Sequence, residues 1–149
     1  MSKYWYLVAM ISGLVGCATD DEMNTSSAEQ QLAGTDTLFA GEALGPSREI
    51  GIGNTVLFYQ NDNNLVLYQN RGAGLVPIWF TGADLGTTPG QFVMQGDCNA
   101  VVYNSVHASW NSKTPGLGTN CFARVIQGDW FICSGTTRVF SALGGGRCG

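Results

Sequence analysis

The sequence predicts an all-β fold for residues 36–149, and three observations carry this prediction. Short runs of Val, Leu, Ile, Phe and Tyr alternate with turns of Gly, Asn, Asp and Pro. No segment keeps the 3.6-residue apolar period of an amphipathic helix. A strand–turn–strand unit also recurs along the chain, and such repetition indicates a repeated architecture.

Length and composition limit both the size and the partners of the protein. With 149 residues, the chain suffices for one domain with a real core. Charged residues make up 12% of it, the net charge is −4, and there is no basic cluster. Lys and Arg supply most of the affinity for nucleic acid and for anionic lipid headgroups, so the sequence argues against both partners.

Residues 1–16 have the form of a targeting segment. Lys3 is the only early charge, and Tyr4–Val15 is then apolar or small, too short to span a bilayer. Leu14-Val15-Gly16-Cys17 resembles the bacterial lipobox, which implies that Cys17 is lipidated and becomes the mature N-terminus. An ordinary signal peptide with an incidental cysteine is the alternative.

The lipobox resemblance also implies a location. Several acyl chains on one cysteine give a firm membrane anchor. The expected protein is therefore exported and lipid-anchored at the cell envelope, in the outer membrane or at the cell surface, with Ala18 favouring the outer membrane by the enteric sorting rule. Residues 17–35, which follow, are polar, acidic and poor in large apolar groups, and they predict a flexible tether.

Three similar units follow, at Val56–Tyr68, Gln91–Tyr103 and Ala123–Gly135. Their anchor glutamines, Gln60, Gln95 and Gln127, are 35 and 32 residues apart. Each unit is followed by an aromatic and a small polar residue: Trp79 with Thr81, Trp110 with Ser112, and Phe140 with Ser141. The repetition suggests threefold pseudosymmetry, with the aromatic side chains meeting on the axis as shared core.

Four cysteines remain once Cys17 is assigned to the lipid, and they predict two disulfides. Three pairings are possible. Moderate loop lengths favour Cys98–Cys121 and Cys133–Cys148, each worth about 3 kcal/mol in the chain-entropy model. There is no CxxC motif and only one histidine in the sequence, so neither a metal site nor a cofactor is expected.

The first unit places several polar groups on one side of a hairpin. Gln60 closes the incoming strand, and residues 61–64 form an Asn- and Asp-rich turn. Val66 and Tyr68 share one face of the outgoing strand, while Leu65 and Leu67 point to the core. The amides, the carboxylate and the phenol can each bond a sugar hydroxyl, and the valine can contact ring C–H groups.

The pattern Gln-x-Asp-x-Asn-x-Val-x-Tyr occurs twice in full and resembles the signature of the bulb-type mannose-binding lectins of monocots, the snowdrop class. Asp36–Leu44 looks like the opening strand of that family, and Cys98 and Cys121 match its internal disulfide. The resemblance covers Asp36 to Phe140. It implies a β-prism II fold, with three four-stranded antiparallel sheets around a pseudo-threefold axis.

The resemblance also implies roles for the matched residues. The aspartates and asparagines would hold the axial 2-hydroxyl of mannose, the glutamines the 3-hydroxyl and the tyrosines the 4-hydroxyl, while the valines touch the ring. The two predicted sites comprise Gln60, Asp62, Asn64, Val66 and Tyr68, and Gln95, Asp97, Asn99, Val101 and Tyr103.

The third unit departs from this pattern. Gln127 and Asp129 remain, but Phe131, Cys133 and Gly135 stand where the pattern has Asn, Val and Tyr. We expect this site to be degenerate. The Gly-rich tail over residues 144–149 also argues against the C-terminal strand exchange by which plant relatives dimerise, and the oligomeric state is left open.

Nothing in the sequence predicts an enzyme. His107 has a hydroxyl nearby in Ser109 but no evident orienting acid, and Asp62, Asp97 and Asp129 belong to different repeats. The leading hypothesis is a lectin of the bacterial cell envelope for mannose-type glycans or exopolysaccharide. The alternative is a non-enzymatic protein-interaction or bacteriocin-like module that uses the same scaffold without binding sugar.

Overall fold

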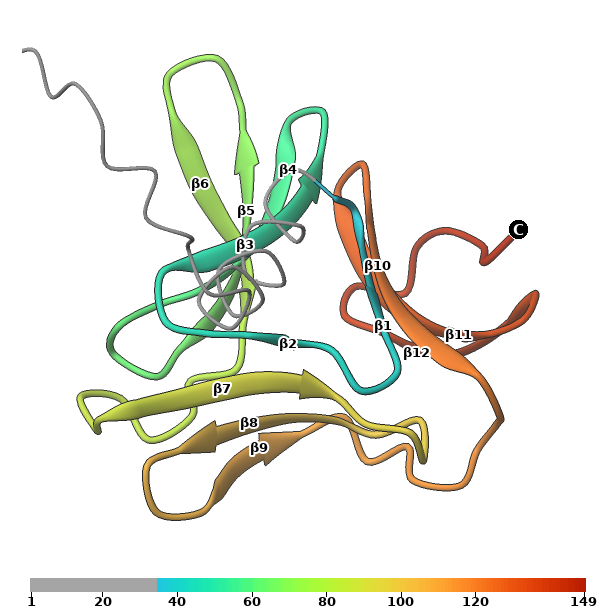
Figure 1. Ribbon diagram of the computed structural model, residues 1–149. Coiled ribbons are helices and arrows are strands. Elements are labelled where there is room, and N and C mark those ends of the chain that lie inside the picture. Colours follow the sequence, from blue (N-terminus) through green and yellow to red (C-terminus); the bar gives the residue numbers. More distant parts are fainter. Residues whose placement is uncertain (1–34) are drawn as a thin grey trace, which may run out of the picture.

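The computed structural model describes residues 35–149 and has twelve strands in three four-stranded antiparallel sheets (Figure 1). The predicted all-β fold with three such sheets is confirmed. Residues 1–34 lie outside the described part, and with them the expected signal segment, the lipidated Cys17 and nearly all of the tether.

Each sheet combines three consecutive strands with one earlier strand. In the first sheet the earlier strand is β3, which directly precedes the other three, whereas the second and third sheets take β2 and β1 from the N-terminal segment. The first sheet has the order β3-β4-β5-β6, the second β2-β7-β8-β9, and the third β1-β10-β11-β12. In chain order, the strands are β1 (Thr37–Phe39), β2 (Ala43–Leu44), β3 (Arg48–Ile52), β4 (Thr55–Tyr59), β5 (Leu65–Asn70), β6 (Leu75–Phe80), β7 (Pro89–Met94), β8 (Ala100–Asn104), β9 (Ala108–Asn111), β10 (Cys121–Ile126), β11 (Asp129–Ser134) and β12 (Thr137–Ser141).

The opening segment differs from the prediction of one strand over Asp36–Leu44. It forms β1 in the third sheet and then β2 in the second, and the chain turns at residues 40–42 between them. Gly41 has φ +90°, a conformation that glycine adopts without a steric penalty, and it allows the change of sheet. The N-terminal segment thereby joins the third sheet to the second (Figure 1).

The core lies between the inner faces of the three sheets. Period-2 alternation places one side chain of every pair inward, and Leu57, Leu67, Phe92, Val102 and Ile132 are among those fully buried. The register aligns the units: Leu67 pairs with Trp79, Val102 with Trp110, and Ile132 with Phe140. The pseudosymmetry inferred from the sequence is therefore present in the pairing of the strands.

Aromatic rings fill the axis, as the repeat pattern predicts. The ring centroids of Trp79 and Trp110 are 5.7 Å apart, and those of Trp110 and Phe140 are 6.1 Å apart. The sequence analysis missed Trp130, which is fully buried and lies within 4.8–6.3 Å of Trp79, Phe92, Trp110 and Phe140. Its indole nitrogen is the one buried side-chain donor without a partner among residues 35–149.

Both predicted disulfides are present. Cys98 is bonded to Cys121 and Cys133 to Cys148, with sequence separations of 23 and 15 residues. The first joins the second unit to the third sheet, and the second holds the C-terminal segment against β11.

A substitution at Trp130 tests whether this residue is central to the aromatic core. We expect Trp130→Ala to lower the free energy of unfolding by about 3–5 kcal/mol, because it removes the ring that four other aromatic side chains contact. Phe39→Ala is the control, because this ring is 56% exposed and should cost less than about 1 kcal/mol. Urea denaturation of the two variants measures both values, and equal losses would contradict the assignment of the core.

Candidate functional site

Two hairpin loops of the same shape carry the predicted site residues. Residues 60–64 connect β4 to β5, and residues 95–99 connect β7 to β8. In each loop the first residue donates its backbone N–H to the carbonyl of the last at 2.9 Å. The fourth residue is left-handed in both, with φ 69° at Asn63 and 73° at Cys98. The two copies of the sequence pattern therefore fold alike.

The aspartates sit at the exposed middle of these loops. Asp62 Oδ1 accepts the backbone N–H of Asn64 at 3.0 Å, and Asp97 Oδ1 accepts that of Asn99 at 2.9 Å. This bond closes an Asx turn and fixes the carboxylate plane. Within residues 35–149, neither Oδ2 atom has a hydrogen-bond partner, so one oxygen of each carboxylate remains to accept a hydroxyl from a ligand.

The asparagines are oriented by the end of the last strand in each sheet. Asn64 Oδ1 accepts the Thr81 hydroxyl at 3.0 Å and the Gly82 N–H at 2.9 Å. Asn99 Oδ1 accepts the Ser112 hydroxyl at 3.1 Å. Because a backbone N–H can only donate, the amide oxygen of Asn64 must face it, and the Nδ2 group is left as a donor.

The small polar residue after each tryptophan, visible in the sequence, therefore has a specific task that the sequence analysis did not identify. Thr81 and Ser112 hold the asparagine amides.

The glutamine and tyrosine of each motif bond to one another. Gln60 Nε2 donates to the Tyr68 hydroxyl at 2.6 Å, and Gln95 Nε2 to that of Tyr103 at 2.7 Å. The phenol keeps its own hydrogen to donate, and the amide oxygen of each glutamine is free to accept. Within residues 35–149, the Gln–Tyr pair and the Asp–Asn pair of each motif thus keep donor and acceptor atoms that bonds within the chain do not occupy.

The valines lie deeper than the sequence suggests. Val66 is 2% exposed and Val101 3%, because each is flanked by cross-strand neighbours on the outer face of its sheet. Val66 pairs with Phe58 and Phe80, and Val101 with Val93 and Asn111. The apolar surface next to the polar groups is set largely by these neighbours.

Each loop is held from below by its left-handed residue, and the two loops use different bonds. The buried Asn63 accepts the Tyr59 hydroxyl at 2.8 Å and donates to the Ala83 carbonyl at 3.1 Å and to the Ser109 hydroxyl at 3.0 Å. In the second loop, Cys98 occupies this place and is bonded to Cys121. Sequence reasoning treated Asn63 only as a turn residue.

The third hairpin has a different register from the one the sequence pattern suggested. Trp130 pairs with Val125, and Ile132 with Ala123, so residues 126–129 stand in place of the five residues of the other loops, and only Gln127 and Gly128 lie outside the strands. Asp129 consequently takes the place of Asn64 and Asn99, Phe131 that of the valines, and Cys133 that of the tyrosines. The alignment of Asp129 with Asp62 and Asp97 was wrong by two positions, because the loop shortens and the chain turns tightly at Gln127-Gly128.

Asp129 has no capacity left for a ligand. It is 2% exposed and accepts four bonds from its own chain: the N–H groups of Trp130, Leu143 and Gly145, and the Ser141 hydroxyl. Gln127 lies against Gly53 in the β3–β4 turn. The third unit thus lacks the arrangement found in the other two.

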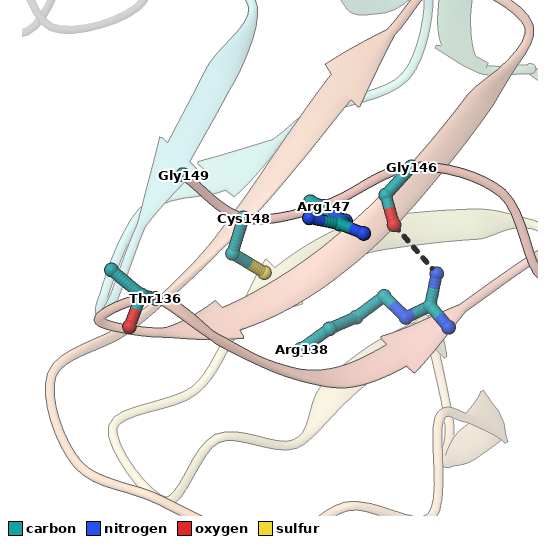
Figure 2. A pocket seen from close by; sticks show the side chains of 6 residues that line it. All are labelled: Thr136, Arg138, Gly146, Arg147, Cys148 and Gly149. Carbon is teal, nitrogen blue, oxygen red and sulfur yellow. Dashed lines mark hydrogen bonds between the residues drawn. The ribbon is translucent and has the colours of Figure 1, made fainter.

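The C-terminal segment covers this part of the third sheet. Arg138 Nη1 donates to the carbonyls of Gly144, Gly145 and Gly146 at 2.7–3.3 Å, and Cys148 is bonded to Cys133. Figure 2 shows the Arg138 side chain reaching the Gly146 carbonyl across a hollow lined also by Thr136, Arg147 and Gly149. Arg138 and the disulfide together hold the tail in place.

His107 does have an acid partner, contrary to the sequence expectation. Its Nε2 lies 2.7 Å from Asp84 Oδ2, in an exposed pair. Ser109, however, donates its hydroxyl to the Val102 carbonyl and accepts from Asn63, and no bond joins it to His107. Asp62 and Asp97 lie in hairpin loops of two different sheets, and Asp129 begins β11 of the third. These residues form no nucleophile–base pair and no pair of carboxylates.

Residues 35–149 lack both a candidate metal site and a candidate membrane span. Within them, no three His, Cys, Asp or Glu side chains are grouped so that they could hold a metal ion. No helix in this part of the chain has the length and apolarity needed to cross a bilayer.

Comparison with known proteins follows the same lines as the geometry. No protein-family model matches the chain. A mannose-specific lectin of Aloe arborescens is 49% identical over 52 residues, which are 34% of this chain and only 48% of the length of that lectin.

Solved structures match over most of the described chain. A monomeric monocot mannose-binding lectin from Gastrodia elata superposes with a TM-score of 0.63 and 26% identity, over 72% of this chain and 96% of that one. The mannose-specific agglutinin of snowdrop (Galanthus nivalis) bulbs, solved with methyl-α-D-mannoside, gives a TM-score of 0.58 and 32% identity, over 66% of this chain and 88% of that one.

The three four-stranded sheets and these matches define a lectin of the β-prism II class. The 32% sequence identity to the snowdrop agglutinin, over 88% of that chain, shows more than a shared fold. The chain belongs to the family of the monocot mannose-binding lectins.

Tyr59 tests how the first loop is held. Burial raises the pKa of its phenol above the usual 10.0, the Asp62 charge adds to this effect, and the Gly90 N–H opposes it. Since the folded protein then binds the phenol proton more tightly than the unfolded chain, this stabilisation is lost as the pH rises above about 10. Tyr59→Phe should lower the free energy of unfolding by about 1–3 kcal/mol at neutral pH. The difference in stability between this variant and wild type should narrow above about pH 10.

Thermal unfolding between pH 7 and 11 measures this difference. Tyr68→Phe, whose hydroxyl is only half-buried and bonds Gln60, should cost less than about 1 kcal/mol at neutral pH. A Tyr59→Phe variant as stable as wild type at neutral pH would contradict the role of the Tyr59–Asn63 bond.

Proposed function

We propose that the protein binds mannose-containing glycans, without catalysis, through two sites around Asp62 and Asp97. One observation carries the proposal: in both hairpins a carboxylate oxygen, an amide Nδ2 donor, a glutamine oxygen and a phenol, all from one loop and the strand that follows it, keep unused hydrogen-bonding capacity. Adjacent sugar hydroxyls each donate and accept, so they need such a mixed set. The snowdrop agglutinin, which shares this fold, was solved with methyl-α-D-mannoside.

The roles of the residues follow from the family pattern. Asp62 with Asn64, and Asp97 with Asn99, bind the axial 2-hydroxyl that distinguishes mannose from glucose. Gln60 and Gln95 bind the 3-hydroxyl, while Tyr68 and Tyr103 bind the 4-hydroxyl. The third unit takes no part, because the only acid at its hairpin is saturated by bonds within the chain.

Each site offers few hydrogen bonds, and this limits its affinity. Four or so neutral hydrogen bonds, each worth about 1 kcal/mol net, correspond to a millimolar Kd for a single sugar, near −4 kcal/mol. A polysaccharide that engages both sites, or several copies of the protein, gains from effective concentration. The natural ligand is therefore expected to be polymeric.

Asp62 and Asp97 provide the test. The Asp62→Ala/Asp97→Ala double variant should lose retention on mannan-agarose, while each single variant is retained more weakly than wild type. Asp62→Asn/Asp97→Asn is the more conservative version, since asparagine keeps the acceptor that closes each turn and removes only the charge.

The matched control also removes two negative charges, but at positions outside the proposed sites. Asp36→Asn/Glu42→Gln alters carboxylates outside both loops and should leave retention unchanged. Circular dichroism verifies that each variant is folded. A folded wild type that ignores mannan and every mannoside on a glycan array would overturn the proposal and favour the protein-interaction module.

We also propose that the protein acts at a bacterial cell envelope, anchored through a lipid on Cys17. The support is the sequence alone: a short apolar segment after Lys3 that ends in Leu-Val-Gly-Cys, followed by a polar linker. An anchored lectin would display its two sites to glycans at or beyond the surface.

Cys17→Ser separates anchoring from export. In a lipoprotein-processing host, wild type should partition into Triton X-114 and the membrane fraction, whereas Cys17→Ser should shift to the aqueous phase. Labelling with a radioactive fatty acid should follow the same pattern. Unchanged partitioning of Cys17→Ser would show that no lipid on this residue holds the protein.

A further inference from the structure

The two proposed sites differ in the cross-strand neighbours of their valines, which are Phe58 and Phe80 in the first site and Val93 and Asn111 in the second. Phe80 ends β6 in the first sheet, and it pairs with Val66 across the β5–β6 ladder. The equivalent residue in the second sheet is Asn111, which pairs with Val101. Cross-strand partners project from the same face of a sheet, so Phe80 lies beside the polar groups of the first motif.

A second contact locates the ring more closely. A Cβ atom built on Gly82 would lie 3.7 Å from Phe80 Cδ2 and Cε2. Gly82 is the residue whose N–H binds Asn64 Oδ1. The ring therefore lies beside Gly82, which bonds the asparagine, and beside Val66, its cross-strand partner.

This ring is open to solvent. Phe80 is 61% exposed, although it adjoins a site whose own valine is nearly buried. A single exposed apolar side chain is ordinary on a protein surface. What distinguishes Phe80 is that it lies next to a motif whose polar side chains have unused hydrogen-bonding capacity. Aromatic rings suit the apolar C–H face of a pyranose, because they offer a flat surface at low cost in conformational entropy.

The second site has no such surface. Asn111 Oδ1 accepts the Lys113 N–H at 2.8 Å, so a polar residue whose acceptor is already occupied stands where Phe80 does, next to a lysine. The five motif residues themselves are of the same types in both sites. Both sites should therefore recognise a first mannose in the same way. The contrast between Phe80 and Asn111 predicts that the two sites prefer different larger ligands.

We propose that Phe80 forms a second subsite next to the mannose site at Asp62, and that this subsite stacks against the apolar face of a further pyranose linked to the bound mannose. The proposal rests on the proposed function. It makes the first site selective for an oligosaccharide over a single mannose, while the site at Asp97 takes a terminal mannose with little dependence on its neighbour.

The test measures a ratio in each site separately. The Asp97→Ala variant removes the second site, so that only the first can bind sugar. The Asp62→Ala variant removes the first site, so that only the second can bind sugar. NMR titration of each variant gives Kd values for methyl α-mannoside and for the three α-linked mannobioses (1→2, 1→3 and 1→6). In the Asp97→Ala background, we expect the best mannobiose to bind about fivefold more tightly than the monosaccharide, as covering some 40 Å² of ring would produce.

Phe80→Ala in that background should bring the ratio close to one, and Phe80→Trp should preserve it. In the Asp62→Ala background, the ratio should start near one, and Asn111→Phe should raise it. Nuclear Overhauser contacts between the Phe80 ring and the second pyranose of the best mannobiose would identify the stacking directly.

A ratio that Phe80→Ala leaves unchanged, with methyl α-mannoside still bound, would overturn this inference alone. Failure of the folded Asp97→Ala protein to bind any of the four sugars would overturn the function proposed for the first site, and the subsite with it. The aromatic ring is exposed, so its replacement should leave the fold intact, which circular dichroism checks.

Discussion

The candidate sites depend on one constraint: the left-handed, buried residue that holds each five-residue hairpin loop from below. A non-glycine residue with positive φ is costly unless its surroundings fix it. Asn63 is fixed by bonds to Tyr59, Ala83 and Ser109, and Cys98 by its disulfide to Cys121. Where the loop is one residue shorter, at residues 126–129, the hairpin closes tightly and the site geometry is lost.

From this fixed loop the rest of the site follows in steps. The loop presents the aspartate at its exposed middle and the asparagine at its end. Thr81 and Ser112 then orient the asparagine amides from the neighbouring strand end, and the glutamine–tyrosine bond sets the far edge. The aromatic core fixes the distance between the three sheets, and so between the sites they support.

Much of this arrangement could be predicted from the sequence because it follows from short-range periodicity. The repeat interval predicted three similar sheets, alternation predicted which side chains share a face, and the aromatic residue after each unit predicted the axis. The register confirms these points at Leu67–Trp79 and Val102–Trp110. The disulfide pairing followed from loop lengths and the family pattern.

The features that the sequence did not reveal depend on contacts between distant segments or on a change of length. A one-residue shortening of the third loop is invisible when the motif is matched without gaps, and it misplaced Asp129 by two positions. Asn63 resembles any turn asparagine until Ser109, 46 residues later, is seen to bond it. Nor does the pattern tell that the opening segment changes sheet at Gly41, or that Asp84 pairs with His107.

The measurement that tests this account most directly is the response of asparagine side-chain amides to methyl α-mannoside, followed by ¹⁵N NMR. The Nδ2 groups of Asn64 and Asn99 face the ligand in this account, whereas that of Asn63 is occupied beneath the loop. Saturating sugar should therefore shift the Asn64 and Asn99 signals and leave Asn63 in place. A shift confined to Asn63, or no shift at Asn64 and Asn99, would contradict it.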